Sequence, residues 1–161
     1  MHSELHVDQG LDREARYATL LPQVKALLDG ETNTVANMAN LSAAVFATFG
    51  FHWVGFYLVD GETLVLGPFQ GPIACTRLFR GKGVCAAAWE SGKTLIVDDV
   101  DAFPGHVACS SLSRSEIVVP VKNAAGEVVA VFDVDSTELA DFSDVDRTGL
   151  EALVAVLEDQ L

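Results

Sequence analysis

Hydrophobic residues recur at helical spacing in the first third of the chain. After a polar lead over residues 1–11, a stretch that begins at Asp12 carries an apolar stripe, and Asp29-Gly30 supplies a stop signal. A second stripe begins after Asn33, which is a favourable N-cap, and ends at Gly50. The two stripes consist of Leu20, Leu21, Val24, Leu27 and Leu28, and of Val35, Met38, Leu41, Val45 and Phe49. The pattern predicts two amphipathic helices that pack as a pair.

A different pattern, rich in aromatic and β-branched residues, predicts two β-hairpins. Residues 53–59 and 63–66 flank Asp60-Gly61, and residues 117–122 and 127–135 flank the turn at 123–126. A further apolar strand is expected over residues 94–97. Hairpin connections pair neighbouring strands antiparallel, so we expect a mainly antiparallel sheet.

The remaining segments complete an α+β fold. Residues 84–90 predict a short helix, and a last helix follows the N-cap Ser143, with Leu150, Leu153, Val154 and Leu157 on its buried face. Residues 67–83 are rich in Gly and Pro, and residues 98–115 lack a period and predict a long loop. We expect one domain over residues 1–161, with helices packed on the sheet.

Charge and composition narrow the range of partners. The formal net charge is −13, so the protein repels phosphate backbones and anionic lipid, and neither nucleic acid nor a membrane is an expected partner. Residues 1–8 lack the basic and apolar regions of a secretory signal, and no run of eighteen apolar residues occurs. We therefore expect a cytoplasmic protein.

The chain has three cysteines, Cys75, Cys85 and Cys109. An odd number in a reducing compartment gives poor support to a disulfide framework, so the thiols are expected to be free, metal-bound or catalytic. The helix start at Cys85, and His106 near Cys109, would favour thiolates. The alternatives are small buried hydrophobic residues or a structural zinc site with His106, although the cysteine spacing lacks close pairs. Thiol–disulfide cycling is the remaining use.

Carboxylates form a second candidate group. Asp133 and Asp135 lie two apart at the end of a strand, so both side chains project from one face. With Glu116 they could clamp an ammonium group, and a strand end in solvent is the alternative.

Aromatic residues form a third candidate group. Trp53 and Tyr57 share a face on either side of Gly55 and predict either core packing or an aromatic wall around a small apolar group. His52 is expected to be structural or exposed.

Five segments together resemble the free methionine-(R)-sulfoxide reductases, a family built on a GAF domain. The resemblance extends from the strand at Trp53 through the closing helix, with Ala86 as a departure where the family has glycine. The segments are GPFQG (67–71), GKGVC (81–85), FPGHVAC (103–109), SEIVVP (115–120) and DVDS (133–136).

This resemblance implies a reaction and a role for each candidate. The substrate would be free methionine-(R)-sulfoxide, attacked by Cys109, with Cys75 as the principal resolving thiol and Cys85 as a second or relay thiol. The disulfide would be reduced by thioredoxin, without a metal or an organic cofactor, in a possible homodimer. Glu116, Asp133 and Asp135 would hold the amino group and assist the sulfoxide oxygen, and Trp53 and Tyr57 would enclose the methyl group.

A second function remains open. Most GAF domains are sensors, so the alternative is a non-enzymatic domain that binds an amino-acid-like ligand or responds to redox state. Such a domain would bind without turnover.

Overall fold

A central antiparallel sheet separates two layers that differ in character. The computed structural model describes residues 4–161, and residues 1–3 of the predicted polar lead lie outside the described residues. Six strands pair in the order β3-β2-β1-β6-β5-β4. They are β1 (Trp53–Asp60), β2 (Thr63–Gln70), β3 (Arg77–Phe79), β4 (Leu95–Val97), β5 (Ser115–Lys122) and β6 (Val128–Ser136). The predicted α+β class is confirmed.

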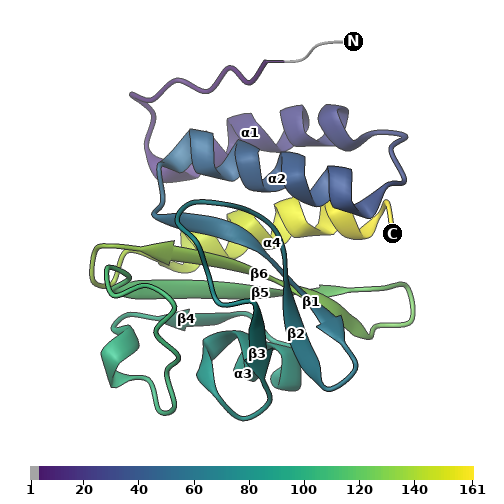
Figure 1. Ribbon diagram of the computed structural model, residues 1–161. Helices are drawn as coiled ribbons and strands as arrows, with labels where there is room; N and C mark the ends of the chain where they lie inside the picture. The colour runs from purple at the N-terminus through teal and green to yellow at the C-terminus, as the bar shows by residue number, and fades with distance from the viewer. Residues whose placement is uncertain (1–3) are drawn as a thin grey trace.

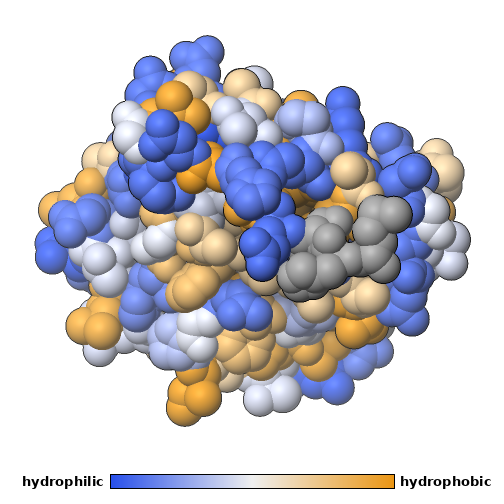
Figure 2. Space-filling view, turned by 90° about the horizontal axis from the view of Figure 1, so that it is seen from above, coloured by the Kyte–Doolittle hydropathy of each residue, from blue (hydrophilic) through white to orange (hydrophobic). Residues whose placement is uncertain are grey.

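The helices lie on both faces of this sheet. Figure 1 shows α1 (Arg13–Leu28), α2 (Thr34–Phe49) and α4 (Asp144–Glu158) on one face, and α3 (Gly83–Ser91) on the other. Seen from the side of α1 and α2, hydrophilic side chains are interspersed with smaller hydrophobic areas (Figure 2). No helix within residues 4–161 combines the length and hydrophobicity that crossing a membrane requires.

The predicted caps explain where the long helices begin. Asp12 and Asn33 each accept a hydrogen bond from the backbone three residues later, at Ala15 and Ala36. Ser143 and Asp146 form a capping box at the start of α4. The prediction that Val35 lies on the buried stripe is wrong, because this residue in the first turn of α2 is 63% exposed.

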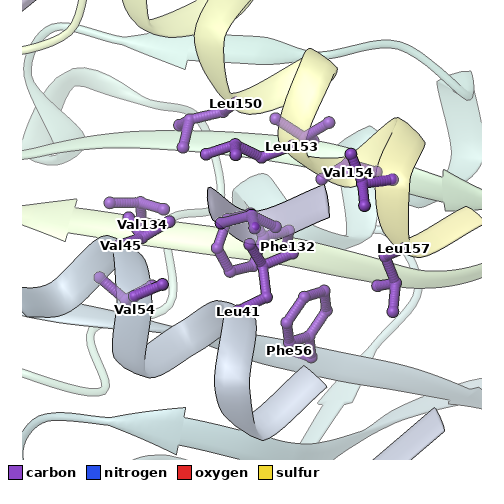
Figure 3. Packing of buried hydrophobic residues seen from close by; sticks show 14 of the residues in the cluster. Leu41, Val45, Val54, Phe56, Phe132, Val134, Leu150, Leu153, Val154 and Leu157 are labelled. Atoms are coloured by element: carbon purple, nitrogen blue, oxygen red, sulfur yellow. The ribbon is translucent and has the colours of Figure 1, made fainter. Parts of the chain in front are cut away.

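The main core fills the space between α1, α2, α4 and the sheet. Alternate residues of β1 and β6, including Val54, Phe56, Phe132 and Val134, face these helices (Figure 3). Phe56 and Phe132 stack with ring centroids 4.5 Å apart. This packing fixes the register of the two central strands, because a slip of one residue would turn their apolar side chains to the opposite face.

The intervening residues of the same strands face the other layer. Trp53, Tyr57 and Val131 belong to a second cluster, completed by Val118 of β5, α3 and the loops around it. Two segments here are more ordered than expected: β2 continues to Gln70 and β3 follows within residues 67–83, and the loop after β4 holds a short 3₁₀ helix, η1 (Val100–Ala102). The candidate chemical groups all lie on this side of the sheet.

Candidate active site

A cavity opens between the sheet, the start of α3 and two loops, at residues 71–76 and 103–113. The space between its walls is about 590 Å³ when the open solvent at its mouth is included. Its lining brings together residues from every candidate group: Trp53, Tyr57, Cys85, Cys109, Glu116, Asp133 and Asp135.

Three carboxyl groups form the floor of the cavity. Glu116 of β5 pairs with Asp135 of β6, and Asp133 lies two residues back on the same face. Glu116 and Asp133 are 7% and 5% exposed, and Asp135 is partly buried. The prediction that Asp133 and Asp135 share a face is confirmed, and the alternative of a strand end in solvent is wrong at this position.

Burial and mutual repulsion favour the protonated forms of these groups. Burial raises the pKa of Glu116 well above its ordinary value, and the charge of Asp133 raises it further. Burial likewise raises the pKa of Asp133 and of Asp135, with added repulsion from Asp135 and Glu116 respectively. Such a cluster can take up a cation, or supply a proton to a bound molecule.

The cysteines divide into a bonded pair and a free thiol. Cys75 and Cys109 form a disulfide with Cα atoms 5.4 Å apart, and these are the two thiols to which the resemblance assigns resolution and attack. The bond also removes these two thiols from the alternative of a structural zinc site with His106. A pair of sulfurs that are half-buried beside a cavity is suited to reversible oxidation.

The third cysteine is buried above the carboxyl groups. Cys85 is the free cysteine of the described chain, and its Sγ lies 4.0 Å from Oε2 of Glu116. Burial, together with the negative charges of Asp133 and Glu116, raises its pKa well above the ordinary value. The predicted thiolate at the helix start is therefore wrong for Cys85, because desolvation and repulsion outweigh the helix dipole.

Aromatic rings form one wall of the cavity. Trp53 stacks on Tyr57 and on Phe69, with ring centroids 5.9 Å and 5.2 Å apart. The space that Gly55 leaves is already filled, since an added Cβ would lie 2.3 Å from Cβ of Phe69. Gly55 thus makes room for the ring of Phe69 rather than for a ligand, and Phe69 supports Trp53 without itself lining the cavity.

Hydrogen bonds from the first strand hold the Cys75 loop, and a contact from the residue before that strand reaches the Cys109 loop. The Trp53 indole donates to the Pro72 carbonyl at 3.1 Å, and the Tyr57 hydroxyl donates to the Cys75 carbonyl at 2.8 Å. His52 has a partner that the sequence does not reveal: its Nε2 lies 3.1 Å from Oγ of Ser110, next to Cys109. One strand and the residue before it therefore position the two halves of the disulfide.

Comparison with known proteins shows to which family the chain belongs. Residues 32–159 match the GAF domain family. The free methionine-R-sulfoxide reductase of Escherichia coli (strain K12) is 46% identical over 146 residues, covering 90% of this chain and 88% of that protein. The chain belongs to the free methionine-R-sulfoxide reductase family.

Other members and relatives extend the comparison. The X-ray structure of the free methionine-R-sulfoxide reductase from Neisseria meningitidis, in complex with its substrate, has 50% identity and a TM-score of 0.94, covering 99% of this chain and 95% of that one. GAF domain-containing protein A of Dictyostelium discoideum is 56% identical over 105 residues, which are 65% of this chain and 66% of that relative, slightly less than two thirds of its length. The reductase family thus shares this fold over nearly the whole chain.

Proposed function

We propose that the protein reduces free methionine-(R)-sulfoxide to methionine by a thiol mechanism. The observation that carries the proposal is the Cys75–Cys109 disulfide beside a cavity whose floor consists of two buried carboxyl groups and a partly buried one. The disulfide supplies a two-electron redox pair, and the floor supplies a site for a free amino group. The activity of the E. coli and Neisseria relatives gives the substrate.

Substrate binding follows from the two walls of the cavity. The ammonium group would lie against Glu116, Asp133 and Asp135, which then ionise at lower pH because a cation offsets their repulsion. The aromatic wall of Trp53 and Tyr57 would enclose the methyl group. A methionine residue within a protein has no free amino group, so this arrangement selects the free amino acid.

The chemical steps transfer one oxygen atom and two electrons. The Cys109 thiolate attacks the sulfoxide sulfur and the oxygen accepts protons, so methionine leaves and a sulfenic acid remains on Cys109. The raised pKa of the floor carboxyl groups suits one of them to supply a proton. The Cys75 thiol then attacks the Cys109 sulfur, which releases water and forms the disulfide. A dithiol such as thioredoxin restores both thiols.

The proposal also covers the location of the protein, its oligomeric state and the role of Cys85. Reduction by thioredoxin is a cytoplasmic activity, and we place the protein there, as a homodimer. Cys85 would act as a second resolving or relay thiol if it can approach Cys109.

An epimer-resolved assay tests the function. Purified protein, with dithiothreitol or thioredoxin as reductant, should release methionine from the free R epimer and from neither the S epimer nor a peptide-bound sulfoxide. Cys109→Ser should abolish turnover. In the absence of a reductant, Cys75→Ser should complete one turnover and retain a dimedone-reactive sulfenic acid on Cys109. Cys85→Ser should retain repeated turnover when the reductant is present. Binding of the free sulfoxide without any release of methionine would instead support the sensor function.

A further inference from the structure

One thiol and two of the floor carboxylates converge in the cavity. One donor atom each from Cys85, Glu116 and Asp133 lie within 4.8 Å of one another, and all three residues are buried. In tetrahedral coordination, a sulfur and an oxygen ligand on the same zinc ion are about 3.6 Å apart. The Sγ–Oε2 distance from Cys85 to Glu116 is 4.0 Å, so small side-chain movements would close the set.

A separate observation concerns the hydrogen bonding of Asp133. Oδ1 of Asp133 is buried and has no hydrogen-bond partner among the described residues, and the residue as a whole is 5% exposed. A buried carboxylate oxygen without a partner carries a free-energy cost that a bound cation removes. Asp133 lines the cavity, which leaves it accessible to an ion that enters through the mouth.

We infer that Cys85, Glu116 and Asp133 form a binding site for a thiophilic divalent cation of the Zn²⁺ class. The thiol, and any of the two carboxyl groups that is protonated, releases its proton to solvent when the cation binds, so the ion lies among one thiolate and two carboxylates and the complex keeps a net charge of −1. A thiolate ligand selects against Mg²⁺ and Ca²⁺, which prefer sets made of oxygen alone. The site survives oxidation of the protein, because Cys85 lies outside the Cys75–Cys109 bond.

The consequence is inhibition by direct competition. The cation occupies the carboxylates that receive the substrate ammonium, so the two cannot bind together. This part rests on the proposed function, whereas binding of the cation does not. The ion is an inhibitor of the cycle and takes no part in it.

Cobalt provides a spectroscopic probe of the site. Co²⁺ is added to the oxidised full-length protein, in which Cys85 is the remaining thiol. We expect one ion per chain, with the near-ultraviolet charge-transfer band of a cobalt–thiolate bond, and displacement by Zn²⁺ but not by millimolar Mg²⁺. Cys85→Ser should remove the band, and Glu116→Gln and Asp133→Asn should each weaken binding by about tenfold or more.

The controls separate this site from other sources of binding. Asp101→Asn, in the exposed loop after β4, should leave the affinity unchanged. Cys85→Ala serves as a second thiol variant, and a melting curve for each variant establishes that it is folded. A missing band, a band that survives loss of Cys85, or binding indifferent to Glu116 and Asp133 would overturn the site. If the variants change the band as expected but free methionine sulfoxide does not displace Co²⁺, the metal site is supported and the proposed substrate position is wrong.

Discussion

Replacing Asp133 by asparagine should stabilise the protein in a pH-dependent way. In the unfolded chain an aspartate ionises near pH 3.9, whereas burial and the neighbouring Asp135 carboxyl raise the pKa of Asp133 in the folded protein. Between these two values the folded protein binds more protons than the unfolded chain. The free energy of unfolding therefore falls as pH rises, until the pH passes the folded-state pKa. Asparagine cannot ionise, so the variant avoids this loss.

The size of the effect follows from proton linkage. Each proton held by the folded state alone lowers the free energy of unfolding by about 1.4 kcal/mol per pH unit. The stability difference between variant and wild type should thus be smallest near pH 4 and grow at up to this slope. For a domain of this length, each kcal/mol raises the melting temperature by about 2–4 °C.

The assay is urea unfolding of both proteins at several pH values, with metal ions removed by a chelator. Asp29→Asn, which changes an exposed residue after α1, is the matched control and should show no growing difference. A difference that is constant with pH, or that shrinks as pH rises, would refute the argument that Asp133 is held protonated by burial and repulsion. The gain in stability should come with weaker binding of the sulfoxide.

Three further results are expected. Gly149→Ala should cost about 1–3 kcal/mol in urea unfolding, because the new Cβ would lie 2.4 Å from the buried ring of Tyr17. Reduction of the Cys75–Cys109 bond, which joins residues 34 positions apart, should lower the free energy of unfolding by about 3–5 kcal/mol, and Cys75→Ser should show no effect of the reductant. His52→Ala should lower kcat more than it changes KM, because it releases the Cys109 loop; unchanged kcat would exclude this positioning role.

Much of the fold follows from local sequence patterns. The caps Asp12, Asn33 and Ser143 place the long helices to within a residue, and the turn at Asp60-Gly61 places the first hairpin. These signals are local, since a cap or a two-residue turn depends on neighbours in the chain. The strand order does not follow from such signals, because the pairing of β1 with β6 joins segments that are far apart in the chain.

The candidate site also combines features that follow from local sequence patterns with features that do not. The alternation of side chains along a strand predicts that Asp133 and Asp135 share a face, and they do so in the structure. The environment of Cys85 does not follow, because the carboxylates that oppose its ionisation come from β5 and β6, far along the chain. The contact between His52 and Ser110 and the ring of Phe69 against Gly55 depend equally on tertiary packing.

The two parts of the site differ in how firmly the fold holds them, and this difference suits the proposed chemistry. The carboxyl floor stands on β5 and β6, whose opposite faces are locked into the main core by Ile117, Phe132 and Val134. The Cys75 and Cys109 sulfurs lie on loops, which a few hydrogen bonds hold to β1 and to His52 just before it. A cation site gains from fixed geometry, whereas thiols must separate and rejoin in every cycle. The strands meet the first need, because they bury one face in the core and carry the carboxyl groups on the face that lines the cavity. The tethered loops meet the second need.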